Sequence, residues 1–124
     1  AGTLSGNPLS VAAGLATLEG YAEGGLFERA ASMRQAFQDA GHGLRDEANV
    51  IDIRNIGLIA GIELEPRPGA ANARTMDVFR HCFDNGVLVR TTGDTLALTP
   101  SLTVEPAQIG QIVDTIGKAL RAVA

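Results

Sequence analysis

VIDIRNIGLIAGIELE, residues 50–65, is the stretch that decides the fold. It is rich in β-branched residues on both sides of a break at residues 55–57, which predicts two strands joined by a short turn. Pro66 and Pro68 follow and end the second strand, because proline cannot donate to a strand ladder. The stretch therefore predicts a β-hairpin near the middle of the chain.

Two helices are expected before this hairpin. Asn7 and Pro8 are typical of a helix start, because Asn7 can accept from an unpaired backbone amide and proline suits the first helical position. Apolar residues at helical spacing follow, and a Gly-Gly pair ends this helix. A second amphipathic helix over 26–40 is closed by Gly41, and a polar loop is expected over 42–49.

A helix, a second hairpin and a last helix are expected after residue 65. The third helix covers 72–84. Residues 87–90 and 95–99 are expected to pair as strands around a turn at 92–94. Pro106 begins the last helix, whose wide apolar stripe predicts that one side packs on the core.

The expected order is therefore α-α-β-β-α-β-β-α. Hairpin strands with helices on one face indicate an α+β two-layer sandwich. We expect this sandwich to cover residues 25–124, and residues 1–24 to form a loop and a connecting helix that precede it. Because the first helix lies outside the sandwich, it is expected to expose apolar surface in the isolated chain and so to favour self-association.

Composition narrows the functional class. The 124 residues are 45% hydrophobic, enough for one domain with a modest core. The net charge is −4 and the ten basic residues are scattered, which argues against a nucleic-acid partner. No apolar run suits a membrane span, and no signal peptide is evident. Cys82 is the only cysteine, so no internal disulfide or zinc cluster is expected, as fits a reducing, cytoplasmic location.

Two places have residues suited to binding an anion. The first is the loop at residues 1–8, where Gly2 and Thr3 precede a helix N-terminus whose dipole attracts negative charge. The alternative there is a plain turn before a capped helix. The second is Arg90, whose guanidinium can hold a carboxylate through two hydrogen bonds. The alternative there is a surface arginine paired with Asp94 across the hairpin.

Other polar residues are weaker candidates. Arg54 is expected to form a structural ion pair with Asp52 or Glu63. His42 is expected in a surface loop between glycines. Lys118, the only lysine, is expected on the polar face of the last helix, which lacks the desolvated pocket that a Schiff-base lysine needs.

Four stretches together resemble the class III (ω-amino acid) aminotransferases, which have the aspartate-aminotransferase fold. The stretches occur in the order and spacing of that family over essentially the whole chain. They are GTLSGNP at 2–8, DIRNIGL at 52–58 leading into GIEL at 61–64, GVLVR at 86–90 with GDT at 93–95, and TPSL at 99–102. Many family members have Pro-Pro where this chain has Pro100-Ser101.

Within that family, the ω-amino acid–pyruvate and β-alanine–pyruvate transaminases are most similar. Glutamate-1-semialdehyde aminomutase is the alternative with the same cofactor, and a stand-alone, non-enzymatic α+β module that binds a carboxylate or a protein is a third hypothesis. The resemblance implies that Gly2 and Thr3 bind the phosphate of pyridoxal 5'-phosphate held by the neighbouring subunit of a homodimer. It implies that Arg90 is the mobile arginine that pairs with a carboxylate substrate and swings away for an uncharged one.

The resemblance also implies that the chain is the C-terminal segment of a longer enzyme. In the family, the lysine that holds the cofactor and the aspartate at its pyridine nitrogen lie upstream of the Gly-Thr loop. The chain alone is therefore expected to be inactive, because the cofactor supplies the electron sink and the lysine moves the proton. The parent is expected to move an amino group from an amine or ω-amino acid to pyruvate or a similar keto acid, with the donor left open.

Overall fold

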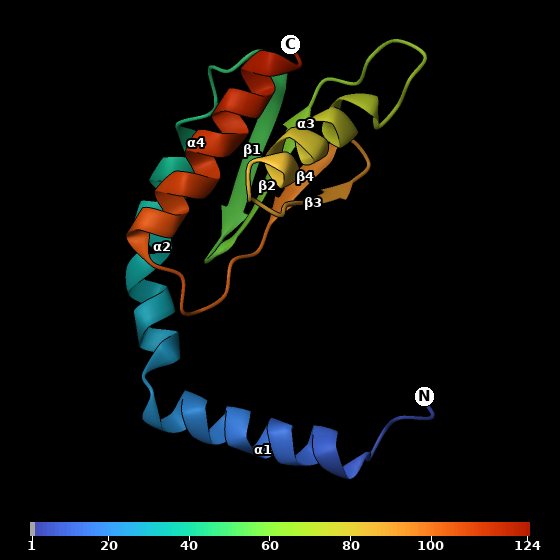
Figure 1. Ribbon diagram of the computed structural model, residues 1–124. Helices are drawn as coiled ribbons and strands as arrows, with labels where there is room; N and C mark the ends of the chain where they lie inside the picture. The colour runs from blue at the N-terminus through green and yellow to red at the C-terminus, as the bar shows by residue number, and fades with distance from the viewer. Residues whose placement is uncertain (1) are drawn as a thin grey trace.

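Residues 2–124 are described by a computed structural model, in which a four-stranded antiparallel sheet has helices packed against one face (Figure 1). The elements follow the predicted order, and the predicted α+β fold class is confirmed. They are α1 (Pro8–Glu23), α2 (Leu26–His42), β1 (Val50–Ile56), β2 (Ile59–Leu64), α3 (Ala73–Asp84), β3 (Arg90–Thr92), β4 (Thr95–Leu98) and α4 (Pro106–Ala122).

Two hairpins make the sheet, in the strand order β1-β2-β4-β3. The predicted hairpin at 50–65 is β1–β2, in which Ile56 lies opposite Ile59. Antiparallel pairing of β2 with β4 joins the two hairpins. Side chains alternate along each strand, so Ala60, Ile62 and Leu64 of β2 are buried beneath the helices.

The opposite face of the sheet carries no helix, and we call it the open face. It is defined by the remaining alternate residues of the four strands. They are Asp52, Arg54, Ile56, Ile59, Gly61, Glu63, Arg90, Thr92, Thr95 and Ala97.

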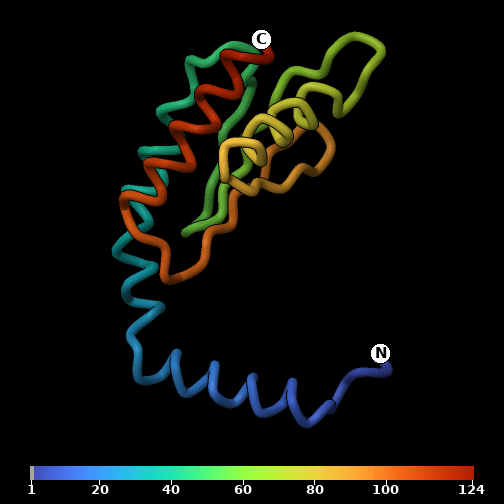
Figure 2. The backbone as a smooth tube through the Cα atoms, in the orientation of Figure 1, coloured from blue at the N-terminus to red at the C-terminus, as the bar shows by residue number. Residues whose placement is uncertain are grey.

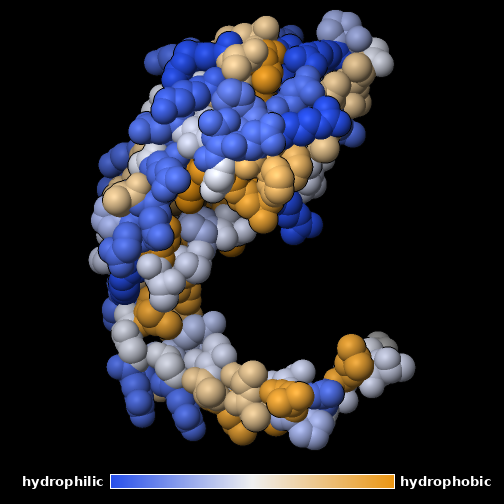
Figure 3. Space-filling view, in the orientation of Figure 1, coloured by the Kyte–Doolittle hydropathy of each residue, from blue (hydrophilic) through white to orange (hydrophobic). Residues whose placement is uncertain are grey.

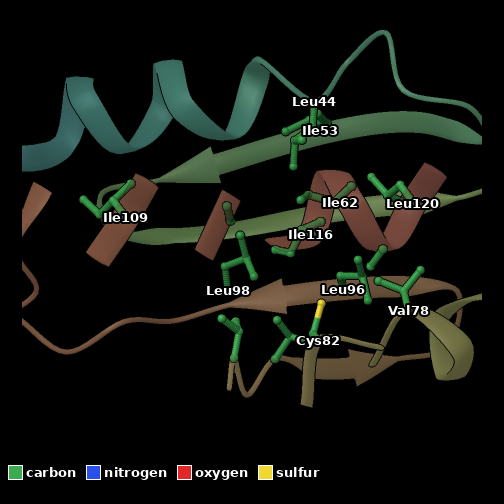
Figure 4. Close-up of a cluster of buried hydrophobic side chains, with 14 of the residues drawn as sticks. Leu44, Ile53, Ile62, Val78, Cys82, Leu96, Leu98, Ile109, Ile116 and Leu120 are labelled. Atoms are coloured by element: carbon green, nitrogen blue, oxygen red, sulfur yellow. The ribbon is translucent and has the colours of Figure 1, made fainter. Parts of the chain in front are cut away.

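The core lies between the sheet and helices α2, α3 and α4 (Figure 4). Ile62 and Leu96 at the centre of the sheet are 0% exposed. The predicted stripe of α4 is confirmed, since Ile109, Ile116 and Leu120 are all buried against this layer. Each such side chain contributes roughly 1.5–3 kcal/mol through removal of apolar area from water, so the core holds the two layers together.

Helix α1 stands apart from this unit (Figure 2). None of its residues is buried, and its contact with the rest is with α2, where the rings of Tyr21 and Phe27 lie 4.8 Å apart. Leu9 is 82% exposed and Leu18 is 62% exposed, and apolar side chains are visible along the helix in Figure 3. The expected exposure of apolar surface on this helix is confirmed. The division of the chain at residue 24 stays a prediction.

The end of the second helix differs from the prediction. Helix α2 continues through Gly41, which is buried, and ends at His42. His42 therefore belongs to the last helical turn and not to a loop. Its Nε2 lies 3.0 Å from Asn55 Oδ1, and its Nδ1 lies 2.9 Å from Arg45 Nη2. The helix therefore passes the glycine that was expected to end it, and Gly41 lies within the packed part of the protein.

Across residues 2–124, none of the helices combines the length and the apolar character that crossing a lipid bilayer requires.

Candidate functional site

Arg90 lies at the edge of the open face. It is exposed, it begins β3, and it pairs in register with Ala97 of β4. Ala97 lies opposite Gly61, which lies opposite Arg54. Four residues therefore form one row across the sheet, with an arginine at each end and two small residues between them.

The two arginines of this row differ in their surroundings. Arg54 donates to Asp52 Oδ2 at 2.5 Å and to Glu63 Oε2 at 2.7 Å, which confirms the predicted structural ion pair. The hydrogen bond to Glu63, and then the one to Asp52, raise the pKa of Arg54 above its usual value. Arg90 makes no ion pair with any of residues 2–124. Its guanidinium is available to an anion from outside the described chain.

An apolar pocket of about 540 Å³ adjoins Arg90. Its wall combines Phe37 of α2 and Phe79 of α3 with Leu98 of β4, and Leu88 and Pro100 from the segments beside the two strands complete it. A cationic group beside an apolar surface is suited to a small carboxylate with an apolar portion.

The pocket wall at Pro100 is held in place by Arg29 of α2. Arg29 donates to the carbonyl oxygens of Leu102 and Val104, both at 2.7 Å, and to Glu105 Oε1 at 2.8 Å. The loop between β4 and α4 is thus fastened to α2. No role for Arg29 was expected from the sequence, because its partners lie more than 70 residues away and are mostly backbone atoms.

The strand that carries Arg90 lies later in the chain than predicted. Residues 87–90 were expected to form it, but β3 covers 90–92, so Arg90 begins the strand and does not end it. The two-residue turn at Gly93 and Asp94 sets this register by pairing Thr92 with Thr95, and Gly93 adopts φ +58°, which glycine permits at low cost. Val87 and Val89 are buried and satisfy their apolar character by packing.

Asp94 does not pair with Arg90, so that alternative reading is wrong. The Asp94 carboxylate accepts from the backbone amide of Asn72 at 2.7 Å. The hydroxyl of Thr75, which is 0% exposed, lies 3.0 Å from the Gly93 carbonyl oxygen. The sequence predicted neither the contact of Asp94 with Asn72 nor that of Thr75 with Gly93. A threonine among the apolar positions of a helix is the one signal that could have drawn attention to it.

The loop at residues 2–7 lies at the far end of α1 from the sheet (Figure 1). Asn7 Oδ1 accepts from the amides of Leu9 and Ser10 at 3.0 and 3.3 Å, which confirms the predicted cap. These amides of the helix N-terminus are therefore already used. Within residues 2–124, the Thr3 hydroxyl and amide have no hydrogen-bond partner, and Thr3 is exposed. The structure does not bring Thr3 and Arg90 together.

Two further side chains, Lys118 and Cys82, carry groups that can act as nucleophiles in other proteins. Lys118 is exposed on α4, as predicted. Cys82 is fully buried in the core, and burial raises the pKa of its thiol to about 11. A buried thiol in its neutral form is a poor nucleophile, so Cys82 serves packing.

The family model for class-III aminotransferases matches residues 1–120. The omega-aminotransferase of Caulobacter vibrioides is 56% identical over 118 residues, which is 95% of this chain and 27% of that protein. The beta-alanine–pyruvate aminotransferase of Pseudomonas aeruginosa is 36% identical over 98% of this chain and 27% of its own length. The omega transaminase of Pseudomonas jessenii in complex with PMP aligns with a TM-score of 0.79 and 29% identity, covering 86% of this chain and 25% of that one. The chain spans about a quarter of the length of these relatives.

Proposed function

Because the chain belongs to the class III aminotransferase family, we propose that the protein containing it is a pyridoxal-phosphate-dependent transaminase. The proposed reaction moves an amino group from an amine or ω-amino acid to pyruvate or a similar keto acid. The names of the Caulobacter and Pseudomonas aeruginosa relatives support this choice over the aminomutase. Membership of the family is at odds with a stand-alone, non-enzymatic module.

The observation that carries the proposal is that the Arg90 side chain is exposed and has no ion pair among residues 2–124. It lies on the open face, beside an apolar pocket. A guanidinium in this state can form two parallel hydrogen bonds to a carboxylate. Neighbouring Ala97 carries only a methyl group, so it does not block the arginine when it swings away from a substrate without a carboxylate.

The loop at residues 2–7 fits the phosphate of the proposed cofactor. Thr3 presents a hydroxyl and a backbone amide that no group within residues 2–124 occupies, and Gly2 lacks a side chain that would block approach. Hydroxyl and amide donors of this kind hold phosphate oxygens. When bound, the cofactor supplies the electron sink for transamination. Gly2 and Thr3 would orient it by its phosphate.

The lysine that the reaction requires is not supplied by the described residues of this chain. Lys118 lies exposed on α4, whereas a lysine that holds the cofactor as a Schiff base needs a desolvated pocket. We therefore expect residues 1–124 alone to have no transaminase activity. A homodimer that builds each site from two subunits, and a cytoplasmic location, remain predictions.

The proposal is tested with the full-length protein and the variants Arg90→Ala and Arg90→Lys. Where the pair with the substrate is desolvated in the full-length protein, loss of the guanidinium should reduce kcat/KM for pyruvate by an amount equivalent to about 2–5 kcal/mol. The half-reaction with a plain amine such as benzylamine should change little. Arg90→Lys should recover only part of the loss, because lysine lacks the planar fork.

Arg34→Ala is the matched control, since Arg34 is exposed on α2 and makes no ion pair with residues 2–124. Equal losses for pyruvate and for the amine would show that Arg90 has a structural role and would refute its assignment to the carboxylate.

A further inference from the structure

We propose that Thr75 and Asp94 are positioning residues for Arg90. They fix the register of the β3–β4 hairpin and so hold the Arg90 side chain on the open face of the sheet. The importance of this for catalysis rests on the proposed function, in which Arg90 binds the substrate carboxylate. The register itself is a separate, measurable property.

The short length of β3 makes its register a weak point. The strand has three residues and lies at the edge of the sheet, with Arg90, Thr91 and Thr92 opposite Ala97, Leu96 and Thr95. Side chains alternate with a period of two, so a slip by one residue moves every side chain to the other face. Such a slip would turn Arg90 beneath the helices, where Leu96 and Leu98 are buried. Three residue pairs at an edge give little protection against it.

The turn of this hairpin is fastened to the start of α3 by two side chains. Asp94 Oδ1 accepts from the Asn72 amide at 2.7 Å. The Thr75 hydroxyl lies 3.0 Å from the Gly93 carbonyl oxygen and 2.9 Å from that of Asn72, so its single proton is shared between the two. The Leu64 amide also donates to the Asp94 carbonyl oxygen at 2.8 Å. Both turn residues are thereby held at defined positions.

The start of α3, to which the turn is fastened, is rigid because α3 is part of the core. Val78 and Cys82 of α3 are both 0% exposed, and Thr75 lies one turn before Val78 on the same buried side. The carboxylate of Asp94 also lies beside the N-terminus of α3, where the helix dipole favours negative charge. The core therefore determines where Gly93 and Asp94 lie, and the two-residue turn determines where Arg90 points.

Each variant removes one contact between the turn and α3. Thr75→Val removes the hydroxyl and keeps the shape, and Asp94→Ala removes the acceptor. Thr75→Ser and Asp94→Asn retain a hydroxyl and a side-chain carbonyl oxygen, so they should behave like the unaltered protein. Thr115→Val is the control, because Thr115 is also buried and donates to a backbone carbonyl, that of Gln111 at 2.7 Å, but lies in α4.

The kinetic readout is KM for pyruvate in the full-length protein. Thr75→Val and Asp94→Ala should raise it about five- to tenfold, while kinetics with benzylamine stay within about twofold. Thr115→Val should leave KM unchanged even if it lowers the melting temperature. In an Arg90→Ala background, Thr75→Val should add no further increase, because its effect acts through Arg90.

Amide hydrogen exchange of residues 90–98 in the same full-length variants gives the second readout. Thr75→Val and Asp94→Ala should speed exchange in this hairpin, and Thr115→Val should not. If Arg90→Ala raises KM for pyruvate but Thr75→Val and Asp94→Ala do not, the positioning role of Thr75 and Asp94 is overturned while the role of Arg90 in binding the carboxylate stands. If Arg90→Ala has no effect on KM for pyruvate, the role of Arg90 in binding the carboxylate fails. Unchanged amide exchange of residues 90–98 in Thr75→Val and Asp94→Ala would independently overturn the proposal that these residues fix the register.

Discussion

Replacement of Arg29 by alanine should destabilise the loop between β4 and α4 and, with it, the whole two-layer unit. The Arg29 side chain is 29% exposed and reaches across from α2 to hold this loop by three hydrogen bonds. Two of them go to the carbonyl oxygens of Leu102 and Val104. The third goes to Glu105, whose side chain is 65% exposed.

The expected magnitude follows from these three bonds. The bond to exposed Glu105 contributes at most about 1 kcal/mol, because water and salt screen such a pair. Each bond from a charged donor to a carbonyl contributes about 1.5 kcal/mol at the lower end of the usual range, which suits a partly exposed group. The sum is about 3–4 kcal/mol. For a chain of 124 residues, this corresponds to a melting temperature lower by about 12–15 °C.

Urea denaturation of the chain, followed by circular dichroism at 222 nm, measures this loss. Arg34→Ala is the control, because it changes the same residue type on the same helix at a position without an ion pair among residues 2–124. Arg29→Lys should recover less than half of the stability, since one ammonium cannot reach two carbonyl oxygens and a carboxylate at once. If Arg29→Ala and Arg34→Ala cost the same, the loop is not held by Arg29 and the reasoning fails.

Three other outcomes are expected. The hydrogen bond from Arg67 lowers the pKa of Asp77, so Asp77→Asn should lower the free energy of unfolding at pH 7. The difference in free energy from the unaltered protein should vanish as the pH falls through the lowered pKa. A difference that persists in strong acid would contradict this. Cys82 should resist labelling by iodoacetamide at pH 8 in the folded chain and react once urea unfolds it, because burial raises the pKa of its thiol to about 11; rapid labelling without urea would show that the core opens. Ile62→Ala should cost about 2–5 kcal/mol in urea denaturation and Ile59→Ala much less, because Ile62 is 0% exposed and Ile59 is 55% exposed on the open face. Similar losses would mean that the two faces of the sheet do not differ in burial.

The element order and the first hairpin could be predicted because their signals are local. In residues 50–65, β-branched residues alternate around a glycine turn, and two prolines follow. The apolar stripe of α4 repeats for more than four turns, so its buried side is clear from the sequence. In such segments the local preference and the final packing agree.

The second hairpin was placed less well because its signals conflict. Residues 87–89 are Val-Leu-Val, which favours a strand, yet Val87 and Val89 pack into the core while the ladder begins at Arg90. The turn at Gly93 and Asp94 decides the register, through contacts with Asn72 and Thr75. Those contacts join positions about twenty residues apart, and no periodicity in the sequence marks them.

The candidate site shows the same division between local and distant information. Arg90 could be chosen because its neighbours resemble a family motif, and the same holds for Thr3. Arg29 could not be chosen, because its partners include two backbone carbonyl oxygens that carry no sequence signature. Side chains that act on distant backbone atoms become visible only when the chain is folded.

The isolation of α1 has a thermodynamic consequence. A helix of 16 residues is only marginally stable in water, and Gly14 and Gly20 in its interior weaken it further. Since it buries none of its own residues against the rest of residues 2–124, its helical content depends on whatever covers its apolar side chains. The fraction of helix over residues 8–23 is therefore a spectroscopic measure of how completely the apolar side chains of this segment are covered.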